Sequence, residues 1–250
     1  MQLTAEQFKQ IEGLLPRQRG NVRLGNLQVL NAILYVAANG CKWRALPERY
    51  GNWHTVYTRM MRWSKAGVLD RVFEQLQRQR LMRVRIEAIS LDSSIVKVHP
   101  DGTGAPKKNG PQALGRSRGG WSTKLHLVAA DDRNVVTWSL GLAGDAPEGR
   151  RLIQALGPHH GLVALLMDSA YQDNATRELA CGLGFVPVVP PNPRRRQPWE
   201  YDKPLYRRRN GIERLFRRLK AWRRVFTRYD KLDLMYAAFI TVALIAEALR

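Results

Sequence analysis

The first 85 residues place apolar positions with the spacing of helices. The clearest case is LGNLQVLNAILYVAANG, where Asn26 is a candidate N-cap and Gly40 a candidate stop. Two further stretches with the same period follow it, HTVYTRMMRWSKAG and VLDRVFEQLQRQRLMRVR. The pattern therefore predicts a small all-α domain over residues 1–85.

From residue 86 onward the pattern changes to short apolar strands. IEAISLDSSIVKV is β-rich, and TKLHLVAADDRNVVTWSLG reads as a β-hairpin with its turn at residues 131–134. LVALLMD and FVPVVP are two further candidate strands, and each follows a helical stretch, APEGRRLIQALG and SAYQDNATRELACGLG respectively. Three strands followed by alternating helices and strands predict a mixed sheet with helices on its faces, which is the element order of the RNase H-like fold.

Two segments lack this periodicity. Residues 101–120 are rich in Gly and Pro and are expected to form a flexible loop, and residues 190–204 form a Pro- and Arg-rich basic loop. Helices are expected over residues 206–220 and over LMYAAFITVALIAEAL, which is too short and interrupted to span a bilayer. The predicted fold class is thus α/β, with an RNase H-like domain over residues 86–250.

The charge is large and unevenly distributed. The chain has 41 Lys and Arg against 21 Asp and Glu, a net charge of +20. Residues 1–85 carry 15 basic and 5 acidic groups, residues 86–191 carry 10 of each, and residues 192–232 carry 15 and 4. Solubility alone does not require two basic segments around a neutral one, so a polyanionic partner is expected, nucleic acid or an acidic lipid surface.

The cysteine content and the N-terminal sequence indicate the cellular compartment in which the protein is expected. Cys41 and Cys181 are the only cysteines, so there is no disulfide framework and no Cys-x-x-Cys metal motif. The start of the chain has mixed charges and does not read as a signal peptide. A cytoplasmic, nucleoid-associated protein with no membrane partner is expected.

Three basic residues lie in the predicted N-terminal domain on one helical stretch, Arg59, Arg62 and Lys65. Several short basic helices suit a helix-turn-helix-like DNA-binding unit. A helical scaffold with solvated charges explains the same pattern, and both interpretations stay open at this point.

Three acids fall at related places in the predicted sheet. Asp92 ends the apolar part of the first strand, Asp168 ends the fourth strand, and Glu213 lies on the helix after the last strand. Chemistry in open α/β sheets gathers at the carboxyl ends of strands, so we expect the three to converge. Carboxylates without His or Cys suit Mg²⁺ or Mn²⁺, and two such ions can activate a water or a 3′-hydroxyl against a phosphodiester.

Each acid also has a structural interpretation. Asp168 is a good N-cap, Asp92 precedes two serines in a possible turn, and Glu213 can pair with arginines one helical turn away. Asp145 is the strongest competitor and is kept as a residue that supports the site. The structural interpretations do not explain why all three acids stand at matching ends of the elements.

The helix over residues 206–220 separates into three faces at 100° per residue. A stripe about 60° wide carries Tyr206, Arg209, Glu213 and Lys220. The predicted core face carries Ile212, Leu215, Phe216 and Leu219, and the basic face carries Arg207, Arg214, Arg217 and Arg218. A carboxylate among arginines stays ionised, because neighbouring cations favour its charged form. It is therefore suited to a metal while the arginines hold phosphates.

These residues resemble a known family. The spacing Tyr206-x2-Arg209-x3-Glu213-x6-Lys220 is similar to the YREK signature of bacterial insertion-sequence transposases of the DDE class. MDSAY around Asp168 and SLDSS around Asp92 resemble the two Asp motifs of that family, and residues 41–73 resemble its N-terminal domain.

The resemblance implies an RNase H-like catalytic domain with Asp92, Asp168 and Glu213 as the DDE triad and two Mg²⁺ or Mn²⁺ ions. It implies binding to terminal inverted repeats in double-stranded DNA, hydrolytic release of 3′-ends and strand transfer into target DNA. Tyr206, Arg209 and Lys220 would contact DNA near the cleaved end, and a homodimer or higher oligomer would hold two ends. The alternatives are a structure-selective nuclease on the same fold and a non-catalytic DNA-binding protein derived from such an enzyme.

Overall fold

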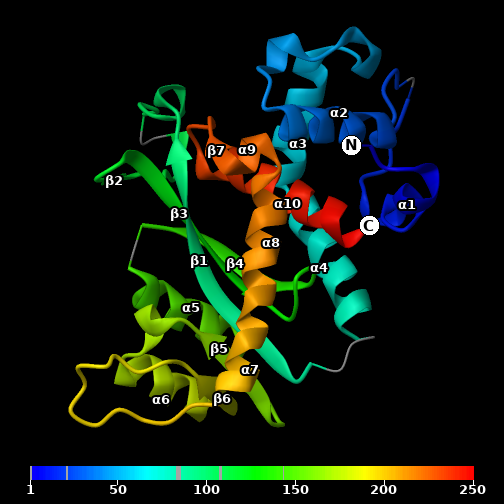
Figure 1. The fold of residues 1–250 in the computed structure, drawn as a ribbon. Helices are drawn as coiled ribbons and strands as arrows, with labels where there is room; N and C mark the ends of the chain where they lie inside the picture. Colours follow the sequence, from blue (N-terminus) through cyan, green and yellow to red (C-terminus); the bar gives the residue numbers. More distant parts are fainter. Residues whose placement is uncertain (1, 21, 83–85, 107–108, 143) are drawn as a thin grey trace. The chain divides into compact units, whose positions relative to one another are not determined.

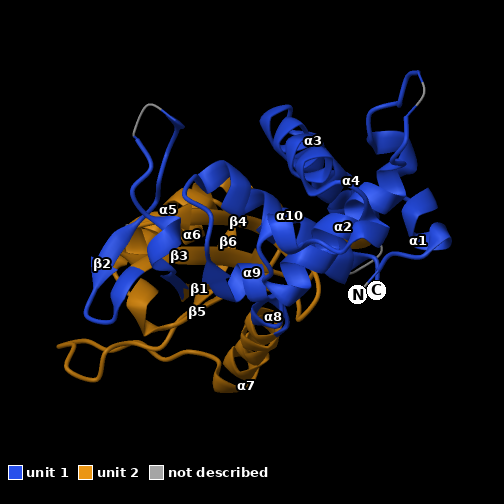
Figure 2. Cartoon of the chain, turned by 90° about the horizontal axis from the view of Figure 1, so that it is seen from above, with its two compact units in different colours: residues 1–79, 96–121, 218–250 blue, residues 80–95, 122–217 orange. Residues whose placement is uncertain are grey.

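The computed structural model describes residues 2–20, 22–82, 86–106, 109–142 and 144–250. The chain folds into two compact units, coloured separately in Figure 2. Unit 1 comprises residues 1–79, 96–121 and 218–250, and unit 2 comprises residues 80–95 and 122–217. The end of the predicted helix that follows Gly67, and with it the predicted domain boundary at residue 85, lies outside the described residues.

Unit 1 is built mainly from helices. They are α1 (Ala5–Lys9), α2 (Asn26–Asn39), α3 (Trp53–Lys65), α4 (Val68–Leu81), α9 (Arg223–Phe226) and α10 (Asp233–Ala248), with 3-10 turns η1 (Glu12–Leu14), η2 (Trp43–Ala45), η3 (Glu48–Tyr50) and η4 (Pro100–Gly102). Strand β2 (Gly115–Ser117) and strand β7 (Thr227–Arg228) complete it, and β7 pairs with the last residues of β1. The element labels are those of Figure 1.

Helix α2 shows how local sequence sets its ends. Gly40 takes a left-handed conformation with φ of 68°, so the predicted stop is confirmed. The predicted N-cap Asn26 is wrong by one residue, because Gly25 is the cap and Asn26 instead donates a side-chain hydrogen bond to the carbonyl of Pro16. The apolar α10 contacts α2, α3 and α9, which explains its apolar sequence. None of the described helices is both long and apolar enough to cross a membrane.

Unit 2 contains most of the mixed sheet. Its strands are most of β1 (Ala88–Val98) and of β3 (Gly120–Ala129), together with β4 (Val135–Gly141), β5 (Val163–Met167) and β6 (Phe185–Val188). Its helices are α5 (Asp145–Leu156), α6 (Asn174–Gly182), α7 (Lys203–Tyr206) and most of α8 (Asn210–Lys220), with turns η6 (Ser169–Tyr171) and η7 (Arg207–Arg209). The strands lie in the order β3-β1-β5-β6, with β4 antiparallel to β3 and β5 parallel to both β1 and β6. The predicted mixed sheet with helices on its faces is confirmed.

The two faces of this sheet follow the period of two that strands impose. On β5, Val163, Leu165 and Met167 pack in one cluster together with residues of α5 and α6. Ala164 and Leu166 face the other side and pack beneath Leu205 and Tyr206 of the α7 segment. Figure 1 shows α5 and α6 on one side of the unit 2 strands and α7 with α8 on the other.

Three predicted elements need correction. The Gly- and Pro-rich segment 101–120 contains β2, which forms a hairpin with β3 because Gly120, at a φ of 98°, makes the tight turn possible. The predicted single helix over residues 169–184 is η6 followed by α6, since Asp173 caps a new helix. The predicted helix over 206–220 is divided by the 3-10 turn η7.

Candidate active site

Asp92 and Asp168 leave the sheet side by side. The parallel ladder of β1 and β5 runs from the pair Ala88 and Ala164 to the pair Leu91 and Met167, and the two aspartates are the residues that directly follow this last pair along the chain. Asp92 ends the apolar part of its strand, as predicted, because residues 88–91 are buried and Asp92 is half-buried, and β1 itself continues to Val98. The parallel pairing stops there, however, so both carboxylates stand where the ladder opens.

Local hydrogen bonds fix both aspartates. The Ser93 N–H donates to Asp92 Oδ1 at 2.8 Å. The Ala170 N–H donates to Asp168 Oδ1 at 2.9 Å, so Asp168 is also the N-cap of η6 that the structural interpretation predicted. A cap uses one of the two carboxylate oxygens, and the other stays available to a ligand.

Arg209 joins Glu213 to Asp92. One Nη of Arg209 donates to Asp92 Oδ2 at 2.8 Å, and the other donates to Glu213 Oε1 at 2.6 Å. The Asp92 and Arg209 side chains are only 15% and 16% exposed, whereas Glu213 is 42% exposed. The predicted pairing of Glu213 with an arginine one turn away is thus present, and the same arginine reaches the first of the two aspartates.

The electrostatics show that all three acids share this cation. Burial raises the pKa of the Asp92 carboxyl, and the charge of Asp168 raises it further, against the lowering effects of the Ser93 N–H and Arg209. Burial opposes the charge of Arg209, but Asp92, Glu213 and Asp168 all favour it, and the pKa of Arg209 stays above its usual value. Each of the three acids therefore attracts the same arginine, and their convergence on a metal ion stays a prediction.

A second group of polar side chains supports Asp92 from the opposite face of β1. Ser93 Oγ donates to Asp145 Oδ1 at 2.5 Å, and Lys124 Nζ donates to the same carboxylate at 3.0 Å. Burial works against the charge of Asp145, but the bonds from Ser93 and Lys124 hold the pKa of its carboxyl below the usual value. Asp145 thus supports the site through Ser93, the residue whose N–H binds Asp92.

Replacing Asp145 by Asn is expected to lower the free energy of unfolding by about 1–3 kcal/mol at neutral pH, because Lys124 loses a partly buried ionic partner. The lowered pKa of Asp145 means that its contribution is fully present above the unfolded pKa near ~4 and is lost as the pH falls through the folded value. Urea denaturation should therefore show a deficit at pH 7 that shrinks below pH ~4. A deficit independent of pH would contradict the ionic role.

The carboxylates of Asp92, Asp168 and Glu213 suit a divalent metal ion chemically, although they are not arranged as a metal-binding site in this structure. Oxygen donors without His or Cys suit Mg²⁺ or Mn²⁺. In the described part of the chain, no group of three His, Cys, Asp or Glu side chains is arranged to hold an ion. Arg209 stands between Asp92 and Glu213, and its guanidinium supplies the positive charge there. An ion would take the place of that charge.

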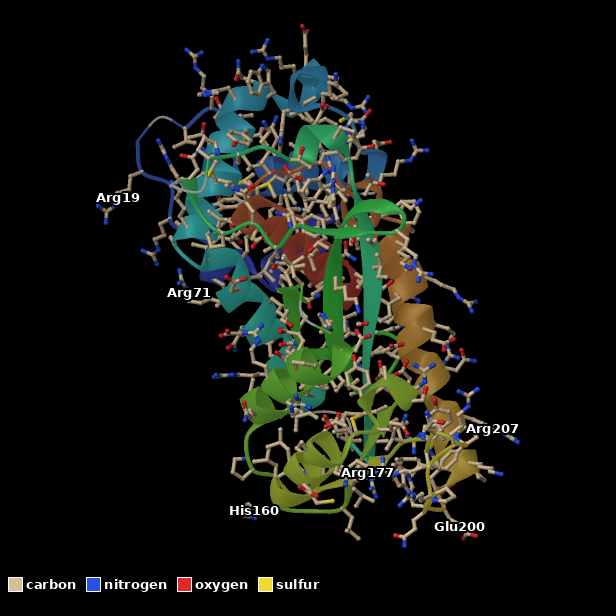
Figure 3. All side chains as sticks on the ribbon, turned by 90° about the vertical axis from the view of Figure 1, so that its left-hand side faces the viewer. Arg19, Arg71, His160, Arg177, Glu200 and Arg207 are labelled. Atoms are coloured by element: carbon tan, nitrogen blue, oxygen red, sulfur yellow. The ribbon has the colours of Figure 1, made fainter. Side chains whose placement is uncertain are left out.

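The remaining residues of the predicted stripe and basic face lie along α7 and α8. Tyr206 ends α7, is half-buried, and has its ring centroid 5.8 Å from the Arg209 guanidinium. Arg214 and Arg217 are exposed, and the carboxylate of Asp132 lies 3.6 Å from the Arg214 Nε. Arg218 and Lys220 belong to the last turn of α8, which unit 1 contains. Arg207 points away from the ribbon in Figure 3.

The predicted core face of α8 is confirmed, because Ile212, Leu215, Phe216 and Leu219 are all buried. On α3, Arg62 and Lys65 are exposed, but Arg59 is half-buried and donates to the Leu24 carbonyl at 2.8 Å. One of the Arg59 N–H groups thus has a structural task. The role of these three residues in DNA binding stays a prediction.

The sequence interpretation missed three residues near the acids. Lys124 and Ser93 were not singled out, since nothing in their spacing places them beside Asp145. Arg194, in the basic loop, lines a groove beside the turn that Asp168 caps. The cluster of arginines in that loop was visible in the sequence, but its position relative to Asp168 was not.

Two family comparisons cover nearly the whole chain. Residues 3–73 match the family described as "Putative transposase of IS4/5 family". Residues 84–247 match the family described as "Transposase DDE domain".

Individual proteins agree with these matches. The "Uncharacterized protein y4sN" of Sinorhizobium fredii is 34% identical over 111 residues, covering 43% of this chain and 86% of the relative. The "Putative transposase for insertion sequence element IS6501" of Brucella ovis is 30% identical over 125 residues, covering 49% of this chain and 94% of the relative. A piggyBac transposase, solved as a synaptic complex with hairpin DNA, superposes with a TM-score of 0.58 at 8% identity, over 97% of this chain and 69% of that one. At this identity the likeness shows the fold alone, and it agrees with the RNase H-like interpretation.

Proposed function

The chain belongs to the family of DDE transposases, and from this premise we propose that Asp92, Asp168 and Glu213 are its catalytic carboxylates. The observation that carries the proposal is the pair of bonds from Arg209 to Asp92 and Glu213, with Asp168 next to Asp92 where the β1–β5 ladder ends. An isolated structural ion pair does not require a third acid at this position. The family uses divalent metal ions, and this donor set suits two Mg²⁺ or Mn²⁺ ions.

The proposed reaction is hydrolysis at the ends of the transposon, followed by attack of the freed 3′-hydroxyl on target DNA. When bound, the ions would supply Lewis acidity toward the attacking and leaving oxygens. The carboxylates of Asp92, Asp168 and Glu213 hold those ions. Ser93 and the Ala170 N–H keep Asp92 and Asp168 in place. Arg209 moves to a DNA phosphate near the cleaved end, where its planar fork can bind two oxygens.

The proposed partners are two DNA segments, the terminal inverted repeats and the target. The basic residues Arg214, Arg217 and Lys220 of α8 would bind phosphates, and the hydroxyl of Tyr206 at the end of α7 would offer a further contact. Two ends must be held together for transposition, so a homodimer or higher oligomer on DNA is part of the proposal.

The test of this function is an assay with labelled end DNA, a supercoiled target and Mg²⁺ or Mn²⁺. Products in which the end is joined to the target support a transposase that carries out strand transfer. Nicking without joining would instead favour the structure-selective nuclease, and binding without any cutting would favour the non-catalytic protein.

Changing Arg217 or Arg218 to Ala is expected to weaken binding to end DNA and to lower the slope of log K against log salt by about one for each phosphate that is no longer neutralised. The reason is that each neutralised phosphate releases counterions. Fluorescence anisotropy at several salt concentrations measures the slope. Arg133→Ala, an exposed arginine in the β3–β4 turn, is the control and should leave the slope unchanged. An unchanged slope for the α8 variants would remove them from the DNA-binding surface.

A further inference from the structure

The basic loop between β6 and α7 has an ordered anchor. The ring of Trp199 lies against two guanidinium groups, Arg177 at 3.6 Å and Arg195 at 4.8 Å from its centroid. Its indole N–H donates to the Val189 carbonyl at 2.8 Å. Figure 3 marks Arg177 and the neighbouring Glu200 at this end of unit 2. Trp199 therefore fixes the predicted basic loop, residues 190–204, at the Val189 carbonyl and against Arg177 of α6.

The same loop is fastened to the segment that follows Asp168. The Asn192 N–H donates to Gln172 Oε1 at 2.5 Å, and Arg195 donates to the Gln172 carbonyl at 3.4 Å. A further Nη of Arg195 donates to Asn174 Oδ1. These hydrogen bonds hold two exposed segments, the loop and the turn after β5, against each other.

Between these segments lies a groove of about 620 Å³. Its lining includes Ser169, Ala170, Gln172, Asn192, Arg194 and Arg195. Ala170 is the residue whose N–H binds the Asp168 carboxylate, so the groove begins beside a proposed catalytic acid. Ala146 also lines the groove and follows Asp145, which supports Asp92 through Ser93.

The groove has a positive electrostatic balance. Its acidic member is Asp173, which pairs with Arg150 at 2.9 Å and accepts hydrogen bonds from Thr176. Burial opposes the charge of Asp173, but the Thr176 bonds and Arg150 hold the pKa of its carboxyl below the usual value. Arg195 is half-buried and committed to the loop, whereas Arg194 is exposed, and in the described part of the chain no carboxylate pairs with it. Arg194 is therefore available to an anion.

We propose that this groove binds the phosphodiester backbone of target DNA, with Arg194 as the residue that binds a phosphate. The inference rests on the proposed function, because strand transfer must bring two DNA segments to the same carboxylates. Arg209 and Tyr206 approach Asp92 from the face of the sheet that α7 covers. The groove approaches Asp168 past the start of α5, on the other face. The acids thus have a separate cationic wall on each side, one for each DNA segment.

The experiment compares Arg194→Gln with Arg196→Gln. Both arginines are exposed in the same loop, but Arg196 does not line the groove, so it is a matched control for charge. Three quantities are measured on each protein: affinity for end DNA, hydrolysis of the 3′-end, and joining to a supercoiled target over a range of target concentrations. For Arg194→Gln we expect end binding and hydrolysis within about twofold of the parent and a concentration for half-maximal joining raised about tenfold. Arg196→Gln should match the parent in all three, and Arg194→Lys should recover part of the joining.

When the parent protein cleaves end DNA, each other result overturns the proposal. Equal losses of end binding and joining would assign the groove to the transposon end. Equal effects of the two Gln variants would show that the loss comes from the lower net charge of the loop and not from the groove. An Arg194→Gln protein that joins normally would show that Arg194 does not bind the target. If the parent protein itself cleaves no end DNA, the proposed function has failed instead. Binding to supercoiled DNA lacking ends then tests the groove separately, with a weakening confined to Arg194→Gln as the supporting outcome.

Discussion

Asp92→Asn, Asp168→Asn and Glu213→Gln are each expected to lower strand cleavage by at least about 10³-fold while leaving binding to end DNA within about threefold. Each change keeps the shape of the side chain but removes the negative charge that is proposed to hold a divalent ion. Loss of several kcal/mol of transition-state stabilisation by the metal corresponds to this factor, at about 1.4 kcal/mol per tenfold. Binding is expected to persist because the arginines proposed to hold the phosphates are unchanged.

The measurement pairs a cleavage assay on labelled end DNA with an anisotropy titration in Ca²⁺, which suits the same oxygen donors. Glu178→Gln is the control, since this exposed glutamate on α6 lies outside the proposed site and should leave cleavage unchanged. Normal cleavage by any of the three site variants would remove that residue from catalysis. Loss of DNA binding together with cleavage would instead point to a structural role.

The convergence of two acids was predictable because strands have a simple geometry. A period of two and a parallel register place residues that follow paired positions next to each other. Asp92 and Asp168 follow the paired residues Leu91 and Met167. Recognising that the two strands are neighbours was therefore enough to predict that the two aspartates lie close together. The buried face of α8 was predictable for the same reason, since a helical period of 3.6 separates Ile212 and Leu215 from the arginines.

The hydrogen bonds around these acids were not predictable, because they join residues far apart in the chain. Ser93 and Asp145 are 52 positions apart, and Arg209 and Asp92 are 117 apart. Spacing within one element predicted only the Arg209–Glu213 pair, which is a local i,i+4 interaction. That the same guanidinium also reaches Asp92 depends on how α7 and η7 lie on the sheet, which no local pattern encodes.

The short irregular elements were not predicted from the sequence for a different reason. Strand β2 has three residues within a segment rich in Gly and Pro, too few for an alternating pattern. Turn η7 interrupts a sequence whose periodicity favoured one continuous helix. The two-unit division also differs in kind from the predicted boundary at residue 85, because the C-terminal α10 packs with α2 and α3 in unit 1. The predicted division into a DNA-binding and a catalytic domain stays a prediction.

Arg209→Gln is expected to tighten Mn²⁺ binding to the DNA-free protein by at least about tenfold while lowering end cleavage by about 10²-fold. The guanidinium lies 2.8 Å from Asp92 and 2.6 Å from Glu213, so an incoming cation meets a like charge that already occupies both carboxylates. A unit charge at about 4 Å is worth about 1–4 kcal/mol at effective dielectric constants between 80 and 20, enough for a tenfold change. Cleavage falls because the glutamine cannot bind the phosphate near the cleaved end as the guanidinium is proposed to do.

Titration calorimetry with Mn²⁺ at low salt measures the first effect, and the cleavage assay measures the second. A further consequence concerns stability, since Asp92 and Glu213 then lack their shared cation in a metal-free buffer. The melting temperature of the variant should fall in EDTA and recover when Mn²⁺ is added, more strongly than for the parent. Arg208→Gln is the matched control, because this neighbouring arginine is exposed and pairs with Glu87 at 3.3 Å, away from the acids. Unchanged or weaker Mn²⁺ binding in Arg209→Gln would show that the guanidinium does not compete with the metal for the carboxylates. Its bonds to Asp92 and Glu213 would then serve to position these two side chains.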